Sequence, residues 1–442
     1  MTMTREWRAS AAARRLLMSA RFVPCCLLAA LAVRWAWALA VDAKPIDDFS
    51  WYYARAIDLA AGRGLTVHGV PTAYWPVGYP LLLATLFLAT GPSVLAAKLL
   101  NVVLGTGIVW LSYRIARRLF ASEAAARLGM LLLAFHPNQI AYTSLTATET
   151  PFLFLMLLGC LLLLLKKRRR WKHRLRHDAL AGIVFGLGCL TKPTMLFVPA
   201  VCLAAALMAR LPRWPDSRHW RRVLGRGAVV YALLALVILP WTVRNYRVFG
   251  RPVFIVTSGG INLLIGNNPQ ATGGFGDADP ATEARLEAEK DEARKEILAR
   301  TIARGWMRQH PWRSIGLIPF RLWHLYAKDV EGFYWNELAA GAEEGPVAGR
   351  PMFVLKIVAE IYYLALIALF VLALMRVRPL PPLGLGLIVY FTLVMMPLFG
   401  SSRLHFPLIP CFAWYAGAWL ASRVTAQEAE PQLAAPLARA WL

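Results

Sequence analysis

Residues 149–170 read ETPFLFLMLLGCLLLLLKKRRR, and this stretch decides the class of the fold. One acidic residue opens an apolar run, and five basic residues follow it. The run approaches the length of about 17–25 residues that an α-helix needs to cross a bilayer. Hydrocarbon offers no hydrogen-bond partners to backbone N–H and C=O groups, so a segment of this kind must be helical. We therefore interpret it as a membrane helix that starts at Glu149 and ends before a basic loop.

Similar apolar blocks recur along the whole chain. Of its 442 residues 58% are hydrophobic and only 17% are charged, whereas roughly a quarter of a soluble domain is charged. The sequence predicts an all-α polytopic membrane protein with about ten transmembrane helices and with outer-face juxtamembrane helices and loops. The expected spans are 22–41, 95–116, 124–142, 149–165, 178–191, 194–210, 226–243, 353–375, 382–398 and 406–422. The apolar segment 79–90 is short, and it fits a re-entrant helix, an interfacial helix or half a span.

The first apolar block, 22–41, has two readings. Five arginines precede it, and Ala38-Leu39-Ala40 resembles a signal-peptidase site. Arg34 interrupts the block, however, and many further spans follow. We expect an uncleaved first helix.

The net charge of +24 does not indicate a nucleic-acid-binding protein, because the basic residues form short clusters between apolar blocks. Successive clusters are two spans apart and so fall on one side, which the positive-inside rule identifies as the cytoplasm. We expect both termini to be cytoplasmic in an inner (plasma) membrane. The clusters lie before residue 22, at 114–118, 166–176, 210–226 and 376–378.

This orientation predicts four parts of the chain. Residues 1–243 form an N-terminal transmembrane module that contains a first outer loop, 42–78. An outer-face segment, 244–352, precedes the C-terminal transmembrane helices, 353–422, and a cytoplasmic tail, 423–442. Within the outer-face segment, 281–309 has the composition of a single solvated helix, and His310-Pro311 is its stop signal.

The first outer loop carries the adjacent carboxylates Asp47 and Asp48, followed by Tyr52 and Tyr53. Neighbouring carboxylates raise each other's pKa, and such a group can act as a general base toward an acceptor hydroxyl or amine. The same residues could simply begin an interfacial helix that runs to Ala61. Aromatic side chains here and in the turn at 71–80 could also support a sugar ring; Trp75 and Tyr79 belong to that turn.

Two further ionisable residues stand at the outer ends of apolar blocks. Glu149 can complement a helix dipole or face a site at the mouth of the bundle. Lys192 lies in Thr191-Lys192-Pro193; it is a functional candidate because it is charged near the membrane, or it extends its amine to the interface.

Polar motifs also mark two later outer segments. One contains Arg244 and Asn245 and continues to Asn262 and Asn267; the other contains Arg403 and His405. Arginine can hold a phosphate with two hydrogen bonds, and Arg403 lies between apolar spans, where it needs an anionic partner. No histidine or cysteine shows metal-ligand spacing, so we expect neither a metal site nor a cofactor.

Together these motifs resemble the integral-membrane glycosyltransferases of the GT-C fold, in particular bacterial relatives of the protein O-mannosyltransferases and the lipid A aminoarabinose transferase. The resemblance covers nearly the whole chain. It rests on the acidic pair, the Trp-Pro-x-Gly-Tyr-Pro turn, Glu149, Thr-Lys-Pro, the Arg-Asn-Tyr…Gly-Asn-Asn-Pro stretch and Arg403. One departure is Trp75, which stands where the aminoarabinose transferase has a lysine.

The resemblance implies an inverting transfer of a sugar from a polyprenyl-phosphate donor to a lipid, glycan or protein acceptor. It implies a catalytic carboxylate about four residues before an aromatic, which Asp48 and Tyr52 match better than Asp47 and Trp51. Glu149 matches a second acidic residue. Because Trp75 replaces that lysine, other cations must bind the donor phosphate. We nominate Lys192, Arg244 and Arg403 as these phosphate-binding residues. The predicted substrate-cavity residues are Tyr52, Tyr53, Trp75, Tyr79, Asn245, Asn262, Asn267 and His405.

Two other classes of function compete with this one. A secondary transporter or lipid flippase would place its charges near the middle of the membrane, whereas the motifs here lie mainly at the outer ends of spans. A non-catalytic scaffold or polymerase-type subunit would not depend on Asp48. Besides the donor and the acceptor, the expected partners are membrane lipids.

Overall fold

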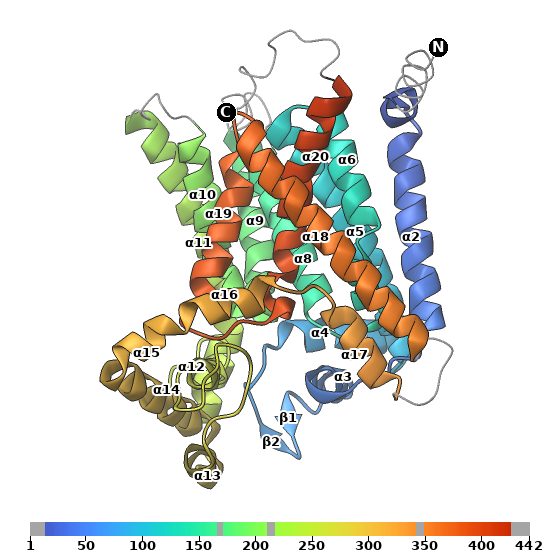
Figure 1. The fold of residues 1–442 in the computed structure, drawn as a ribbon. Coiled ribbons are helices and arrows are strands. Elements are labelled where there is room, and N and C mark those ends of the chain that lie inside the picture. The colour runs from blue at the N-terminus through green and yellow to red at the C-terminus, as the bar shows by residue number, and fades with distance from the viewer. Residues whose placement is uncertain (1–13, 166–170, 210–216, 342–348, 426–442) are drawn as a thin grey trace.

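A computed structural model describes residues 14–165, 171–209, 217–341 and 349–425. Long helices form a bundle, and shorter helices with a small hairpin lie across one end of it (Figure 1). The hairpin pairs β1 (Thr66–Val67) antiparallel with β2 (Val70–Pro71), and it is the only sheet in the described part of the chain. The predicted all-α class is confirmed.

The bundle contains α2 (Phe22–Ala40), α5 (Val94–Phe120), α6 (Glu123–Ala134), α8 (Glu149–Leu164), α9 (Trp171–Thr191), α10 (Val198–Met208), α11 (Ser217–Phe249), α18 (Arg350–Arg376), α19 (Pro382–Met395) and α20 (Ile409–Thr425). Short elements connect some of these helices: α7 (Pro137–Ala141), η1 (Tyr142–Ser144), η2 (Pro193–Met195) and η3 (Ser402–Leu408). The core is formed by the inner faces of the bundle helices, and Phe152, Phe185 and Trp414 are fully buried in it.

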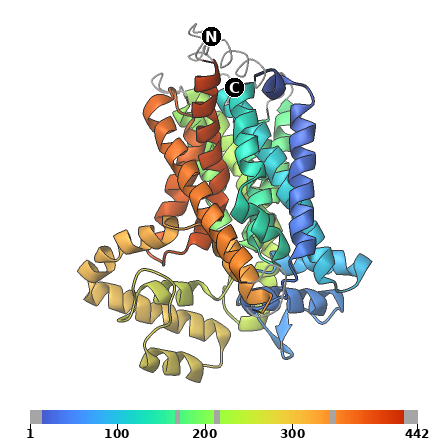
Figure 2. The ribbon, with the colours of Figure 1, turned by 45° about the vertical axis from the view of Figure 1, so that its right-hand side comes forward.

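A layer of shorter elements covers the lower end of the bundle in Figures 1 and 2. It contains the hairpin, α3 (Asp47–Ala60), α4 (Gly78–Thr90), α12 (Gly259–Gly266), α13 (Pro280–Ala288), α14 (Glu292–Gln309), α15 (Pro311–Gly316), α16 (Ile318–Tyr326) and α17 (Glu331–Ala339). We call this the end layer. It is built from the two segments that the sequence predicts to be the long outer loops, 42–78 and 244–352, together with α4.

Fewer helices meet a strict test for crossing a membrane than the sequence predicts. In the described ranges four helices, α2, α5, α11 and α18, are long and apolar enough, and the bent pair of 137–144 with α8 makes a possible fifth. Each predicted span contains a helix, but α6, α8, α10, α19 and α20 have only 11 to 17 residues. The figure of about ten spans therefore stays a prediction.

The ends of the bundle agree with the alternation of charge along the chain. The start of α2 and the end of α20 lie at the end opposite the end layer (Figure 1). Basic residues stand in the last turns of α5, α18 and α20. The basic run at 166–170, Arg210 and Arg213, and the predicted tail from residue 426 onward lie outside the described residues.

Arg34, which interrupts the first apolar block, has a structural explanation. Its side chain is 1% exposed, and its Nη1 donates to the carbonyl of Ala134 at 2.8 Å while Nη2 donates to that of Leu133 at 3.3 Å. These carbonyls belong to the last turn of α6, where the helix has no further backbone N–H groups to donate to them. In an apolar setting such groups need another partner. Arg34 therefore stabilises the point where α6 ends and the chain turns toward Glu149.

The expectation of one helix over 281–309 is wrong in its detail. The structure has two helices, α13 and α14, separated at residues 289–291. Asp291 caps α14 by accepting a hydrogen bond from the backbone N–H of Arg294 at 2.7 Å. A capping aspartate starts a new helix where composition alone would continue the old one. The predicted stop is confirmed, since α14 ends at Gln309.

Glycines allow the close contact between α6 and α20. A Cβ atom on Gly417 would lie 2.5 Å from the backbone nitrogen of Gly129 and 2.6 Å from the carbonyl oxygen of Ala125. These neighbours are backbone atoms that cannot rotate away. The contact fixes α20, and α20 follows η3 directly in sequence.

We predict that Gly417→Ala lowers the midpoint of thermal unfolding in detergent, because overpacking a tight contact costs about 1–3 kcal/mol. Gly225→Ala is the matched control, since nothing lies within 4 Å of a Cβ at that position of α11. The control is expected to leave the midpoint unchanged or raise it, as alanine favours a helix over glycine. Equal midpoints for the two variants would contradict the packing account.

Candidate active site

Four charged side chains from four distant segments meet where the end layer joins the bundle. They are Asp48 in the first turn of α3, Glu149 at the start of α8, Lys192 between α9 and η2, and Arg403 in η3. We call them the charge cluster. The sequence singles out all four, and the structure brings all four together.

Arg403 links the two carboxylates of the charge cluster. Its Nη2 lies 2.8 Å from Asp48 Oδ2, and its Nε lies 2.5 Å from Glu149 Oε1. The guanidinium also lies over the Phe49 ring, 5.0 Å from the ring centroid. The anionic partner that Arg403 requires is thus supplied within the protein, by carboxylates that are far away in sequence.

Glu149 is the most enclosed member of the charge cluster. Its side chain has no exposed surface, and it accepts hydrogen bonds from Arg403 and from Lys192, whose Nζ lies 2.7 Å away. Lys192 and Arg403 keep 22% and 18% of their side-chain surfaces exposed. The two cations are therefore fixed on a buried carboxylate and still reach solvent, an arrangement that leaves them open to an anion.

Asp48 has a less complete set of partners. One carboxylate oxygen pairs with Arg403, while Oδ1 is buried and has no hydrogen-bond partner among the described residues. Burial raises the pKa of Asp48, and the nearby Arg403 only partly opposes that rise. Desolvation disfavours the charged form of a carboxylate and makes it a better proton acceptor. Asp48 therefore has the location and the environment of a general base.

Asp47 is placed differently from Asp48. It begins α3 with a φ of 45°, is exposed, and its backbone carbonyl accepts a hydrogen bond from Ser50 Oγ. Neither aspartate caps the helix with its side chain. The structure thus brings the second aspartate of the pair, and not the first, into the charge cluster.

Aromatic side chains of the first loop and of α4 pack on one another. The Tyr52 ring lies 5.8 Å from that of Trp75 and 5.9 Å from that of Tyr79, measured between centroids. Tyr79 has no exposed surface, so it belongs to the core and does not line a cavity. Trp75 is half-buried, and Tyr53 packs against Phe87 of the same apolar cluster.

Arg244 does not join the other nominated cations. Its guanidinium donates to the carbonyls of Leu65 at 3.0 Å and Thr72 at 2.9 Å. Beside it, Glu292 accepts hydrogen bonds from Thr72 Oγ1 at 2.6 Å and from the backbone N–H of Ala73 at 2.8 Å. These bonds attach the first loop to α11 and α14, a structural role that the predicted phosphate contact did not anticipate.

Three predicted cavity residues are buried and hold backbone in place. Asn245 donates to the carbonyl of Val253, and Asn267 donates to that of Pro397. His405 bonds to the Leu325 carbonyl and to Asp329. None has exposed surface, and their place in a substrate cavity stays a prediction.

Asn262, by contrast, is half-buried in α12. It remains a predicted cavity residue, with no contact to the charge cluster seen in the described part of the chain.

The group that fixes η3 is not among the residues predicted from the sequence. Asp329 is fully buried, and its carboxylate lies 3.1 Å from His405 Nε2 and 2.5 Å from Asn138 Nδ2. His405 is only two residues from Arg403. No local pattern marks Asp329, because its partners are 76 and 191 residues away; its position directly after the aromatic and basic run 320–328 was the available signal.

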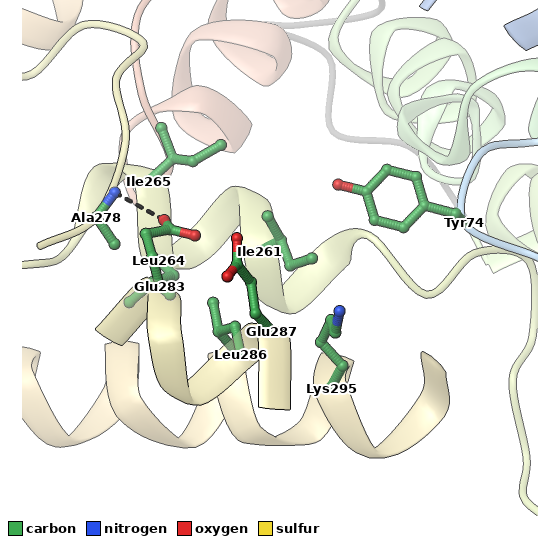
Figure 3. A pocket seen from close by; sticks show the side chains of 9 residues that line it. All are labelled: Tyr74, Ile261, Leu264, Ile265, Ala278, Glu283, Leu286, Glu287 and Lys295. Atoms are coloured by element: carbon green, nitrogen blue, oxygen red, sulfur yellow. Dashed lines mark hydrogen bonds between the residues drawn. The ribbon is translucent and has the colours of Figure 1, made fainter. Parts of the chain in front are cut away.

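A separate cavity of about 220 Å³ lies within the end layer. Figure 3 shows Tyr74 of the first loop facing residues of α12, α13 and α14 across it. Ile261, Leu264 and Leu286 give it apolar walls, and Glu287 and Lys295 give it charge. No member of the charge cluster lines it, so this cavity and the cluster are distinct features.

Comparison with known proteins identifies similar sequences over part of the chain. Residues 75–243 match the family described as dolichyl-phosphate-mannose-protein mannosyltransferase. The undecaprenyl phosphate-alpha-4-amino-4-deoxy-L-arabinose arabinosyl transferase of Pseudomonas aeruginosa strain UCBPP-PA14 is 30% identical over 154 residues. That alignment covers 34% of this chain and 27% of the relative, so the chain matches about a quarter of the length of its curated relative.

Two solved structures are similar in fold to nearly the whole chain. The oligosaccharyltransferase of Archaeoglobus fulgidus, crystallised with zinc and sulfate, aligns with a TM-score of 0.54 and 12% identity over 95% of this chain and 52% of its own. The same organism's enzyme in complex with an inhibitory peptide and a dolichol-phosphate gives 0.52 and 13%, over 94% and 53%. At sequence identities of 12% and 13%, the similarity to these structures shows a shared fold alone. The chain has the GT-C fold of the integral-membrane glycosyltransferases.

Proposed function

We propose that this protein is an inverting glycosyltransferase that moves a sugar from a polyprenyl-phosphate-linked donor to a lipid, glycan or protein acceptor. The single observation that carries the proposal is the charge cluster, in which Asp48 lies 2.8 Å from Arg403 and Lys192 shares Glu149 with that arginine. A candidate base and two candidate phosphate ligands stand together where lipid and water would meet.

The reaction assigns a task to each group. Asp48 takes a proton from the acceptor hydroxyl or amine as that atom attacks the anomeric carbon. The bond from that carbon to the phosphate oxygen breaks, and its electron pair leaves with the lipid phosphate, so the configuration inverts. Arg403 and Lys192 stabilise the negative charge that grows on the phosphate, and preorganised charges of this kind are often the largest catalytic contribution.

The names of similar proteins support a lipid-phosphate donor. The Pseudomonas relative is named for undecaprenyl phosphate, and one structural neighbour was solved with a dolichol-phosphate. The position of the charge cluster supports the same donor, because a lipid tail can reach the boundary between bundle and end layer from the bilayer.

The distribution of charge supports an outer-face reaction in the inner membrane. Basic last turns of α5, α18 and α20 support a cytoplasmic location for one end of the bundle under the positive-inside rule. The end layer then lies outside, and the charge cluster opens to the periplasmic or extracellular face.

We predict that Asp48→Asn lowers sugar transfer by about 100- to 10,000-fold, because an amide cannot accept the proton. Asp47→Asn is the matched control, with the same loss of charge one residue earlier, and should be much milder. Mass spectrometry of glycoconjugates and lipid donors from cells carrying each variant measures the transfer. Near-normal products with Asp48→Asn in a folded protein would disprove the assignment of the base.

The pH dependence of transfer should report the environment of Asp48. Only the ionised carboxylate acts as a base, so activity falls as pH falls through its pKa. Because that pKa is raised, the acid limb of kcat/KM is expected above the ordinary aspartate value of about 3.9. An acid limb at or below that value would show that an unperturbed group, or no carboxylate, controls the step.

Cysteine labelling tests the proposed sidedness in intact cells. We expect a membrane-impermeant maleimide to modify Lys290→Cys, at an exposed site between α13 and α14, and to spare Arg222→Cys, an exposed site in α11. Permeabilised cells provide the control, because both sites should then react. Labelling of position 222 alone in intact cells would reverse the orientation and refute an outer-face reaction.

A further inference from the structure

We propose that Arg403 holds Asp48 in the resting protein and that the donor phosphate takes its place, so that the base is released only when the donor is bound. This inference rests on the proposed function. It adds an order of events to it: the donor binds before the acceptor can be deprotonated.

The positive and negative charges of the cluster balance. Two cations, Lys192 and Arg403, face two carboxylates, Asp48 and Glu149, so the cluster carries no excess positive charge for a phosphate. A phosphate that entered with all three ion pairs intact would lie beside a carboxylate, and like charges at such short range repel strongly where water is partly excluded. Binding therefore favours the departure of one carboxylate.

The contacts identify which carboxylate leaves. Glu149 has no exposed side-chain surface, opens a bundle helix and accepts hydrogen bonds from both cations. Asp48 makes its one recorded side-chain bond to Arg403, lies on the short helix α3 outside the bundle, and leaves Oδ1 without a partner in the described residues. Moving Asp48 breaks one ion pair, whereas moving Glu149 would break two and unpair a buried charge.

Release of Asp48 changes its chemistry. A carboxylate paired with a guanidinium accepts a proton poorly, because the cation stabilises the ionised form. Once the phosphate has replaced Asp48 on Arg403, the carboxylate has left its ion pair and loses that stabilisation. The two steps are therefore coupled: the ligand that Arg403 must bind is also the ligand that activates the base.

The test measures binding of undecaprenyl phosphate, used as the probe, to purified full-length protein in lipid nanodiscs. The coupling predicts that Asp48→Asn binds the probe about tenfold more tightly than the unmodified protein, which corresponds to about 1.4 kcal/mol, although it cannot transfer sugar. Asp47→Asn, which loses the same charge at an exposed position, should change affinity far less. A general electrostatic effect of removing one negative charge would move both variants alike, and that result would overturn the proposal.

Two further variants separate this inference from the proposed function. Arg403→Ala should weaken binding of the probe by at least tenfold. If it does, and Asp48→Asn leaves affinity unchanged or lowers it, the phosphate binds beside Asp48: the coupling is wrong, and the donor site stands. If Arg403→Ala leaves affinity unchanged, the donor site itself is wrong. Should Asp48→Asn fail to fold, Asp48→Ala provides a second neutral variant with the same expected gain.

Discussion

A buried carboxylate at the end of a helix bundle is the constraint on which the rest of the site depends. Glu149 has no exposed side-chain surface, and an isolated buried charge would cost several kcal/mol. Lys192 and Arg403 offset that cost, so α8, the turn after α9 and η3 must all meet at one place. Arg403 also forms an ion pair with Asp48, and this contact brings α3 of the end layer against the bundle. One requirement for charge compensation thus assembles four distant segments.

Further contacts keep that assembly in position. Arg34 completes the last turn of α6 just before the chain turns toward Glu149. Asp329 holds His405 and thereby η3, and the glycine contact between α6 and α20 fixes the helix that follows η3. Arg244 and Glu292 attach the first loop to α11 and α14. These contacts hold the segments around the charge cluster in place, while parts of the Lys192 and Arg403 side chains stay exposed.

Much of this arrangement could be predicted from sequence, and the exceptions share a physical cause. Apolar blocks and basic clusters indicated the helical class, and charge next to an apolar block drew attention to Asp48, Glu149, Lys192 and Arg403. The same reasoning did not anticipate the contacts of Arg244, Asn267 and His405, because a polar residue near a span is equally useful for binding a backbone carbonyl of a distant segment. Sequence position cannot distinguish the two uses when the partner is far away, as Pro397 is for Asn267. The division of 281–309 into two helices depended on a single cap, Asp291.

The central claim is that Arg403 and Lys192 form the phosphate site of a lipid-linked sugar donor. A cryo-electron microscopy structure of the protein in nanodiscs with undecaprenyl phosphate tests it most directly. The account predicts that phosphate oxygens lie within about 4 Å of Arg403 and Lys192 nitrogens, the range of an ion pair, and that Glu149 still holds both cations. Phosphate density elsewhere, with Arg403 still paired to Asp48 and closed to the lipid, would contradict it.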